Sequence, residues 1–145
     1  MSDQSNTKLP TSFWVISIIA LIWNLLGMMA YIMQVTMNEA TLGAMPAAER
    51  AVYESMPSWG VSAFAIAVTA GVLACIVLLL RKAWAVPLFI LSLVAVIVQD
   101  IGALFVAGAL QGMGPTSVIM PLVVILIAGY LIHYSRLARS RGWIS

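Results

Sequence analysis

The chain has 145 residues, of which 63% are hydrophobic and 8% are charged, with a formal net charge of +2. A water-soluble domain carries about 25% charged residues, so this composition excludes a protein surrounded by water. The basic residues are dispersed, which excludes a nucleic-acid-binding face. The single cysteine, Cys75, excludes an internal disulfide and a thiolate metal cluster. We therefore expect one membrane domain, residues 1–145.

Four apolar segments are long enough to cross a bilayer, which takes about 20 residues of helix. They are residues 13–35, 61–80, 84–106 and 118–134. The first exceeds the roughly 7–15 apolar residues of a signal peptide, so we expect a permanent span. A short basic link containing Arg81 and Lys82 separates the second from the third, which must therefore run antiparallel. The sequence predicts an all-α fold, an antiparallel bundle of four transmembrane helices.

The longest connection, residues 36–59, joins the first span to the second. It contains the run PAAERAVYESMP, in which Pro46 suits the first position of a helix and Pro57 ends it. The charged residues of this run lie off its apolar face. We expect a short helix that lies on the bilayer surface or caps the bundle. A lid, or a docking surface for a partner, is the alternative.

Basic residues near the ends of the spans predict the orientation, because cytoplasmic loops carry the excess of Lys and Arg. Six of the seven fall on one side: Lys8, Arg81, Lys82, Arg136, Arg139 and Arg141. Arg50 alone falls on the other side. We therefore expect both termini in the cytoplasm and the connection 36–59, with its short helix, outside it.

The first span carries polar and small residues along one face at helical spacing. They are Ser17, Asn24, Gly27, Tyr31, Gln34 and Asn38. Asn24 lies near the middle of the membrane, about 18 Å from the cytoplasmic end at about 1.5 Å per residue. An unpaired amide is costly in hydrocarbon, so this face must meet protein or a wet cavity. Interhelical packing and a polar pathway or ligand site both remain open.

The second span carries small residues four positions apart. They are Ala63, Ala67, Gly71 and Cys75. This pattern allows two helices to approach closely, so we expect it to serve packing.

Gln99 and Asp100 stand side by side in the apolar run AVIVQDIGAL of the third span. Asp100 lies about 24 Å from the cytoplasmic interface, where an ionised carboxylate costs about 2.5–3.5 kcal/mol. Every Lys and Arg falls outside the spans, so the chain offers no cationic partner at that depth. Asp100 is then protonated, or charged and hydrogen-bonded by Tyr31, Asn24 or Gln34 and the positive end of the fourth helix, or exposed to water from the outer side.

These residues form the candidate site for ligand binding or proton coupling: Asp100, Gln99, Asn24, Tyr31 and Gln34. The alternative is a buried hydrogen-bonding anchor that only fixes the packing of the helices. No His, Cys or paired carboxylates show metal-ligand spacing, and no nucleophile or phosphate-binding motif is present. We therefore expect no metal, no cofactor and no enzymatic activity.

Four stretches resemble a known group of proteins: FWVISIIALIWNLLGMMAYIMQ, PAAERAVYESMPSW, LRKAWAVPLFILSL and YSRLARSRGW. With them the chain resembles a family of small four-span bacterial inner-membrane proteins that genome pipelines often label "sugar transporter". The resemblance implies transport and a bacterial inner membrane, but it supplies no binding residues. The chain differs from small multidrug-resistance exporters, whose key Glu lies in a first helix that here offers Asn24. It also differs from semi-SWEET transporters, which have three spans and a Pro-Gln signature.

Two functions from different classes follow. The first is transport of a small polar solute, a sugar being one candidate, with Asp100 as the coupling or binding group. The second is a non-transporting scaffold or accessory subunit, in which the connection or the basic tail binds partner proteins. Packed helix axes lie about 8–10 Å apart, so we expect little room inside one bundle and a homodimer, or a larger assembly, around any solute route.

Overall fold

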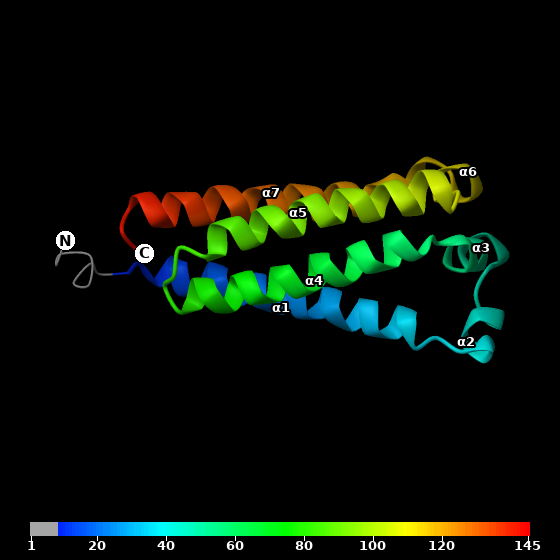
Figure 1. Ribbon diagram of the computed structural model, residues 1–145, viewed down its shortest axis with the longest axis horizontal. Coiled ribbons are helices and arrows are strands. Elements are labelled where there is room, and N and C mark those ends of the chain that lie inside the picture. The colour runs from blue at the N-terminus through cyan, green and yellow to red at the C-terminus, as the bar shows by residue number, and fades with distance from the viewer. Residues whose placement is uncertain (1–8) are drawn as a thin grey trace.

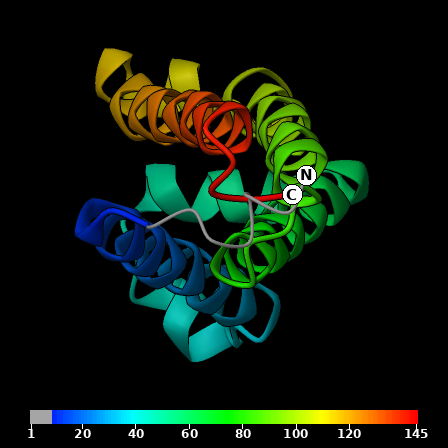
Figure 2. The same ribbon diagram turned by 90° about the vertical axis from the view of Figure 1, so that its left-hand side faces the viewer.

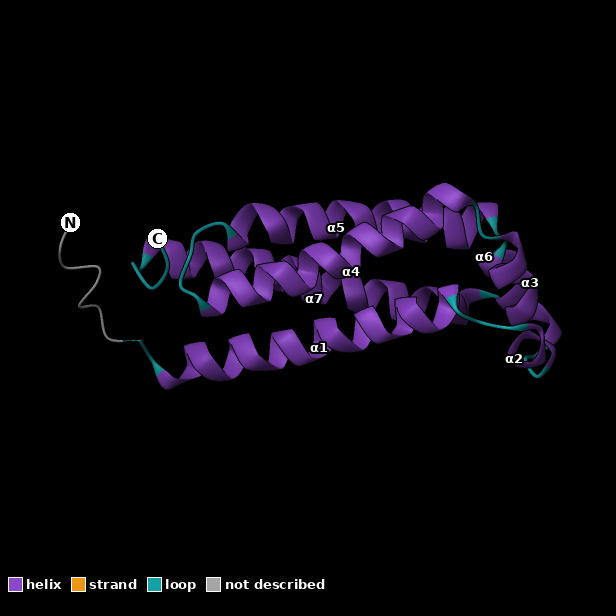
Figure 3. Cartoon of the chain, turned by 60° about the horizontal axis from the view of Figure 1, so that its bottom comes forward, coloured by secondary structure: helices purple, strands orange, loops and turns teal. Residues whose placement is uncertain are grey.

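The computed structural model describes residues 9–145, and within them it contains helices and the turns that join them (Figure 3). In chain order the elements are α1 (Thr11–Val35), α2 (Glu39–Gly43), α3 (Ala47–Ser55), α4 (Ser58–Leu79), α5 (Ala85–Ile101), η2 (Gly102–Val106), α6 (Ala109–Met113), η3 (Pro115–Val118) and α7 (Ile119–Ser140). Four helical segments are long and apolar enough to cross a membrane: Thr11–Val35, Ser58–Leu79, Ala85–Val106 and Pro115–Ser140. The predicted all-helical fold class and its four apolar helices are confirmed.

The last long helix extends further than the sequence predicts. α7 continues to Ser140, beyond the expected end at Tyr134. Its last turn carries Arg139, and a cation near a helix C-terminus is stabilised by the helix dipole. The basic residues that end the apolar run therefore do not end the helix.

Successive long helices run in opposite directions along the molecule (Figure 1). Viewed end-on, they follow one another around a ring in the order α1, α4, α5 and α7 (Figure 2). α4 packs on α5 along their length, α1 packs on α4, and α7 packs on α5. No comparable interface joins α1 to α7 within the described residues, so the ring has one loosely packed side.

Small residues allow α4 and α5 to pack closely. Ala63, Ala67, Gly71 and Cys75 of α4 are all buried, as the four-residue spacing predicts. The Ser92 hydroxyl of α5 crosses this interface and donates a hydrogen bond of 2.8 Å to the carbonyl of Ala67. This bond satisfies a buried hydroxyl that would otherwise be costly in hydrocarbon.

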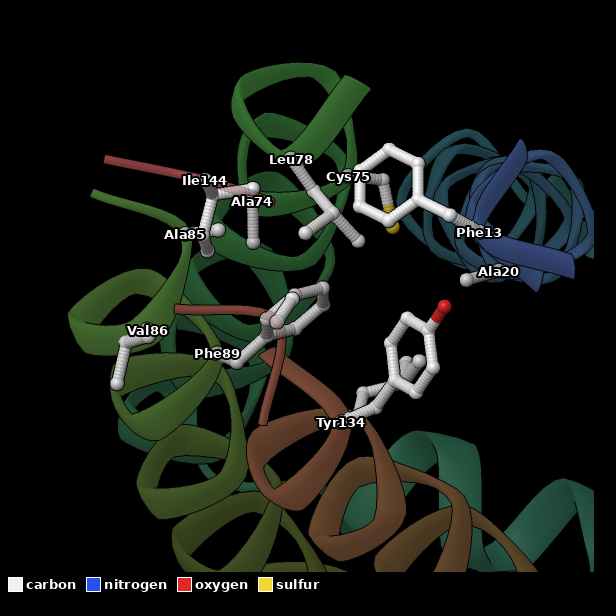
Figure 4. Packing of buried hydrophobic residues seen from close by; sticks show 12 residues of the cluster. Phe13, Ala20, Ala74, Cys75, Leu78, Ala85, Val86, Phe89, Tyr134 and Ile144 are labelled. Atoms are coloured by element: carbon white, nitrogen blue, oxygen red, sulfur yellow. The ribbon is translucent and has the colours of Figure 1, made fainter. Parts of the chain in front are cut away.

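An aromatic and aliphatic cluster fills the end of the bundle where the chain terminates (Figure 4). Phe13 of α1 is fully buried there, with Leu78 of α4 and Phe89 of α5. Tyr134 of α7 points its hydroxyl toward Ala20 of α1, so the cluster bridges α1 and α7 at this end (Figure 4). Ile144, 2% exposed, joins the cluster from the C-terminal tail.

The C-terminal tail, residues 141–145, is held against the turn between α4 and α5. Arg81 Nε donates a hydrogen bond of 2.9 Å to the carbonyl of Trp143, and the amide of Ser145 donates one of 3.1 Å to the carbonyl of Arg81. Arg81 has a φ of 61°, a conformation in which a helix-ending residue is usually glycine. The tail thereby closes this end of the bundle.

At the opposite end, α5 ends at Ile101, one residue after Asp100, and the winding of the helix then changes. η2 is a π-helical turn, closed by a bond of 2.7 Å from the amide of Ala107 to the carbonyl of Gly102. A Cβ at Gly102 would lie 3.3 Å from the ring of Trp59, so this turn packs tightly on the start of α4. α2, α3 and α6 gather at this end (Figure 1).

Candidate functional site

A cavity of about 450 Å³ lies between the four long helices. Its polar lining residues are Asn24, Ser92, Gln99 and Asp100, and its aromatic lining residues are Trp23, Phe64 and Phe89. Most of the remaining lining is aliphatic, and it includes Pro121 and Val124 of α7. Because α1 and α7 are loosely packed, a single chain encloses more space than four closely packed helices would leave.

Asp100 places its carboxylate on the wall of this cavity. Its Oδ2 atom is buried and has no hydrogen-bond partner among residues 9–145. Asn24, Tyr31 and Gln34 therefore do not satisfy this oxygen. No Lys, Arg or His belongs to the cavity lining in the described structure, so no cation is positioned to pair with the carboxylate there.

Asn24 also lines the cavity, but its side chain is held by protein contacts. Its Nδ2 donates to the carbonyl of Ala20 at 2.8 Å and to Cys75 Sγ at 3.4 Å. Its Oδ1 lies against Gly71, in the space that a Cβ at that position would occupy. Asn24 therefore joins α1 to α4, and because its amide nitrogen already donates twice, it offers a solute no further donor.

Tyr31 and Gln34, the outer candidates on α1, are not part of the central cavity. The ring of Tyr31 packs edge-on against Phe64, with centroids 5.4 Å apart. Gln34 lines a second cavity of about 240 Å³, which also involves Gln99 of α5. Gln99 thus borders both cavities and lies between them. Asn38, at the end of the polar face, caps α2 by accepting a bond of 2.9 Å from the amide of Thr41.

α3, in the connection between α1 and α4, supplies one wall of the second cavity. Glu49 and Tyr53 contribute from this helix, and Met113 of α6 is also part of the lining. Burial raises the pKa of Tyr53 above its ordinary value of 10.0, and the nearby charge of Glu49 raises it further. Tyr53 is therefore a neutral hydrogen-bonding group at physiological pH.

The three aromatic lining residues are absent from the set that the sequence identifies. Phe89, Ser92, Val96 and Gln99 recur at spacings of three and four, so they share one face of α5. Following that face back from Gln99 would have found Phe89. Trp23 directly precedes Asn24, and nothing in the sequence indicates that it shares a cavity with α5.

The site combines one carboxylate, one free amide and a mostly apolar wall, a combination suited to holding a small molecule that has one polar group. Within residues 9–145, no three His, Cys, Asp or Glu side chains cluster in a way that could hold a metal ion. Comparisons with protein-family models, with curated proteins and with solved structures found no match to this chain.

Proposed function

We propose that the protein is an integral membrane transporter that carries a small solute through the central cavity, with Asp100 as its binding or proton-coupling group. The observation that carries the proposal is the buried Asp100 Oδ2, which has no partner in the described chain and borders a cavity of about 450 Å³. An ionisable side chain inside a membrane bundle most often marks a solute or ion pathway. A purely structural carboxylate would be expected to have its hydrogen bonds satisfied by protein.

A non-transporting scaffold is the second candidate, and the contacts of Asn24 favour it for that residue. The Asn24 amide bonds to Ala20 and Cys75 and packs on Gly71, which is the arrangement of a packing residue. In this alternative the connection between α1 and α4 or the basic tail binds partner proteins. It gives no role to the unpartnered oxygen of Asp100.

We place the end that carries the C-terminus in the cytoplasm of a bacterial cell, with the chain in the inner membrane. Five basic residues lie at this end of the described structure: Arg81, Lys82, Arg136, Arg139 and Arg141. Lys8, the sixth residue of the predicted set, lies outside the described residues. The excess of positive charge supports a cytoplasmic location, which puts α3 in the periplasm.

A homodimer is also part of the proposal. A second copy against the loosely packed side between α1 and α7 would enclose the central cavity there. Crosslinking in native membranes measures directly whether two copies of the chain associate. Recovery of monomer alone would reject the homodimer and leave the cavity of the single chain as the solute site.

The test is solute flux into proteoliposomes that contain the purified full chain. A panel of radiolabelled sugars, polyols, amines and carboxylates is compared for wild type, Asp100→Asn and Glu54→Gln. Glu54 is exposed and lies outside both cavities, so it controls for the loss of one negative charge. We expect at least a tenfold loss of flux for Asp100→Asn and none for Glu54→Gln. Equal flux in all three would remove Asp100 from the mechanism, and no wild-type flux for any solute would reject transport.

A further inference from the structure

We infer that the central cavity selects an organic cation with an apolar body, and that its charged group sits beside Asp100. The inference rests on the proposed function, because it names the solute class of the same cavity. Three features of the lining carry it: its charge, its aromatic rings and the small number of its free polar groups.

The first feature is the acidic group of the lining, which has no basic partner there. Among the described residues that line the cavity, Asp100 is the only one with an ionisable side chain. The Oδ2 atom of Asp100 has no hydrogen-bond partner. A cationic ligand would supply both the missing counter-charge and a hydrogen-bond donor. An anionic ligand would meet a like charge in surroundings of low dielectric, where repulsion is strong.

The second feature is the aromatic part of the wall. Trp23 of α1, Phe64 of α4 and Phe89 of α5 approach the cavity from three different helices. The face of an aromatic ring attracts an ammonium group, most strongly where water is excluded. Phe64 lies at the level of Asp100, because Gly71 faces Ser92 and the two residues lie seven and eight positions further along antiparallel helices. Trp23 and Phe89 lie deeper, where they and the aliphatic residues around them accommodate an apolar body.

The third feature is the scarcity of free polar groups. The Ser92 hydroxyl donates to Ala67, and the Asn24 amide nitrogen donates to Ala20 and Cys75. The Gln99 amide and the Asp100 carboxylate are the other polar side chains of the lining. A sugar with several hydroxyl groups would leave most of them unpaired, and each unpaired group weakens binding. The lining therefore favours a ligand with one charged group over a sugar.

The experiment compares three ligands that share a phenyl group and differ in the polar group they carry, together with one sugar. Calorimetry on the full chain in zwitterionic nanodiscs measures the affinity of 2-phenylethylammonium, 2-phenylethanol, 3-phenylpropanoate and glucose. Empty nanodiscs correct for partitioning into lipid. We expect the ammonium compound to bind at least tenfold more tightly than the other three. Equal binding of the alcohol, or tighter binding of the anion or glucose, would overturn the inference.

Two variants test the contacts directly. We expect Asp100→Asn to lose at least tenfold in affinity for 2-phenylethylammonium, whereas Glu54→Gln keeps the wild-type affinity. Phe64→Leu should weaken binding of the ammonium compound more than binding of the alcohol, which tests the aromatic contact even if Asp100→Asn fails to fold. Retained ammonium preference in a folded Asp100→Asn protein would overturn the role of the carboxylate.

Binding and flux separate the two proposals. Selective binding of the ammonium compound without flux of any solute would reject transport and leave the ligand class intact. Flux of a sugar, together with no preference for the ammonium compound, would reject the ligand class and leave transport intact.

Discussion

The side chain of Asn24 occupies the space that a Cβ atom at Gly71 would need. Gly71 permits this contact between α1 and α4 because it has no side chain, and the Asn24 amide nitrogen then reaches Ala20 and Cys75. Ser92 Oγ also lies close, 3.3 Å from the position of that Cβ. Three helices therefore meet at one glycine beside the central cavity.

Gly71→Ala should destabilise the bundle. The added methyl group forces Asn24 to move, which breaks its bonds to Ala20 and Cys75, and the nearby Ser92 limits any shift of α4. Overpacking of this kind costs about 1–3 kcal/mol. Reversible unfolding in mixed micelles measures the change in the free energy of unfolding.

The matched control for this substitution is Gly129→Ala in α7, where a Cβ would meet nothing within 4 Å. Asn24→Ala removes the obstacle, so adding Gly71→Ala to it should cost much less than Gly71→Ala alone. The coupling between the two substitutions should be roughly 0.5–3 kcal/mol. Additive effects would show that Asn24 and Gly71 do not act together.

Arg81→Ala should release the C-terminal tail and lower stability. It removes the bond of 2.9 Å to the carbonyl of Trp143 but keeps a non-glycine residue at a φ of 61°. Arg81→Gly removes the same bond and also the backbone strain, which for a left-handed residue is about 1–2 kcal/mol. We therefore expect Arg81→Gly to be more stable than Arg81→Ala. Micelle unfolding compares the stabilities, and hydrogen exchange of residues 141–145 reports the release of the tail.

Lys82→Ala is the control for the loss of a basic residue at the same turn, since Lys82 makes no side-chain bond to the described tail. Unchanged exchange at residues 141–145 in both Arg81 variants would mean that burial of Ile144 and the backbone bond from Ser145 to Arg81 hold the tail without the Arg81 side chain.

The long helices could be predicted from the sequence because the bilayer demands a fixed length of apolar residues, and four segments meet it. The depth of Asp100 in the third span could be predicted in the same way, from the fixed rise per residue of a helix. The tail could not be predicted, since Arg81 adopts a backbone conformation that usually indicates glycine. The π-helical turn after Asp100 also leaves no periodic signal in so short a run.

The site was harder to predict than the fold because it depends on how the helices pack around one another. Helical spacing placed Asn24, Tyr31 and Gln34 on one face of α1. In the structure Asn24 lines the central cavity, Tyr31 contacts Phe64 and Gln34 lines the second cavity. A helix that crosses its neighbours at an angle meets different partners at each turn, and sequence spacing carries no information about that angle.

The proposed orientation predicts which engineered thiols a membrane-impermeant maleimide reaches in intact cells. In a Cys75→Ala background, Glu54→Cys should react without permeabilisation, whereas Arg139→Cys should react only after it. Both positions are exposed in the structure, and they lie at opposite ends of the bundle. The wild-type chain should stay unlabelled, because Cys75 is 0% exposed. The reverse pattern for the two engineered thiols would invert the proposed orientation.

Tyr53 should titrate above its ordinary pKa of 10.0, because burial and, to a smaller extent, Glu49 favour its neutral form. The folded chain then keeps this proton at pH values where the unfolded chain has lost it. The resulting stabilisation is fully present below pH 10.0 and disappears as the pH rises through the folded pKa. Absorbance at the tyrosinate band, taken as the difference between wild type and Tyr53→Phe, should show a midpoint above 10.0. Glu49→Gln should lower that midpoint without bringing it to 10.0, since burial is the larger cause, and Glu39→Gln should leave it unchanged. A wild-type midpoint at or below 10.0 would mean that Tyr53 is open to water and that α3 does not cover the second cavity.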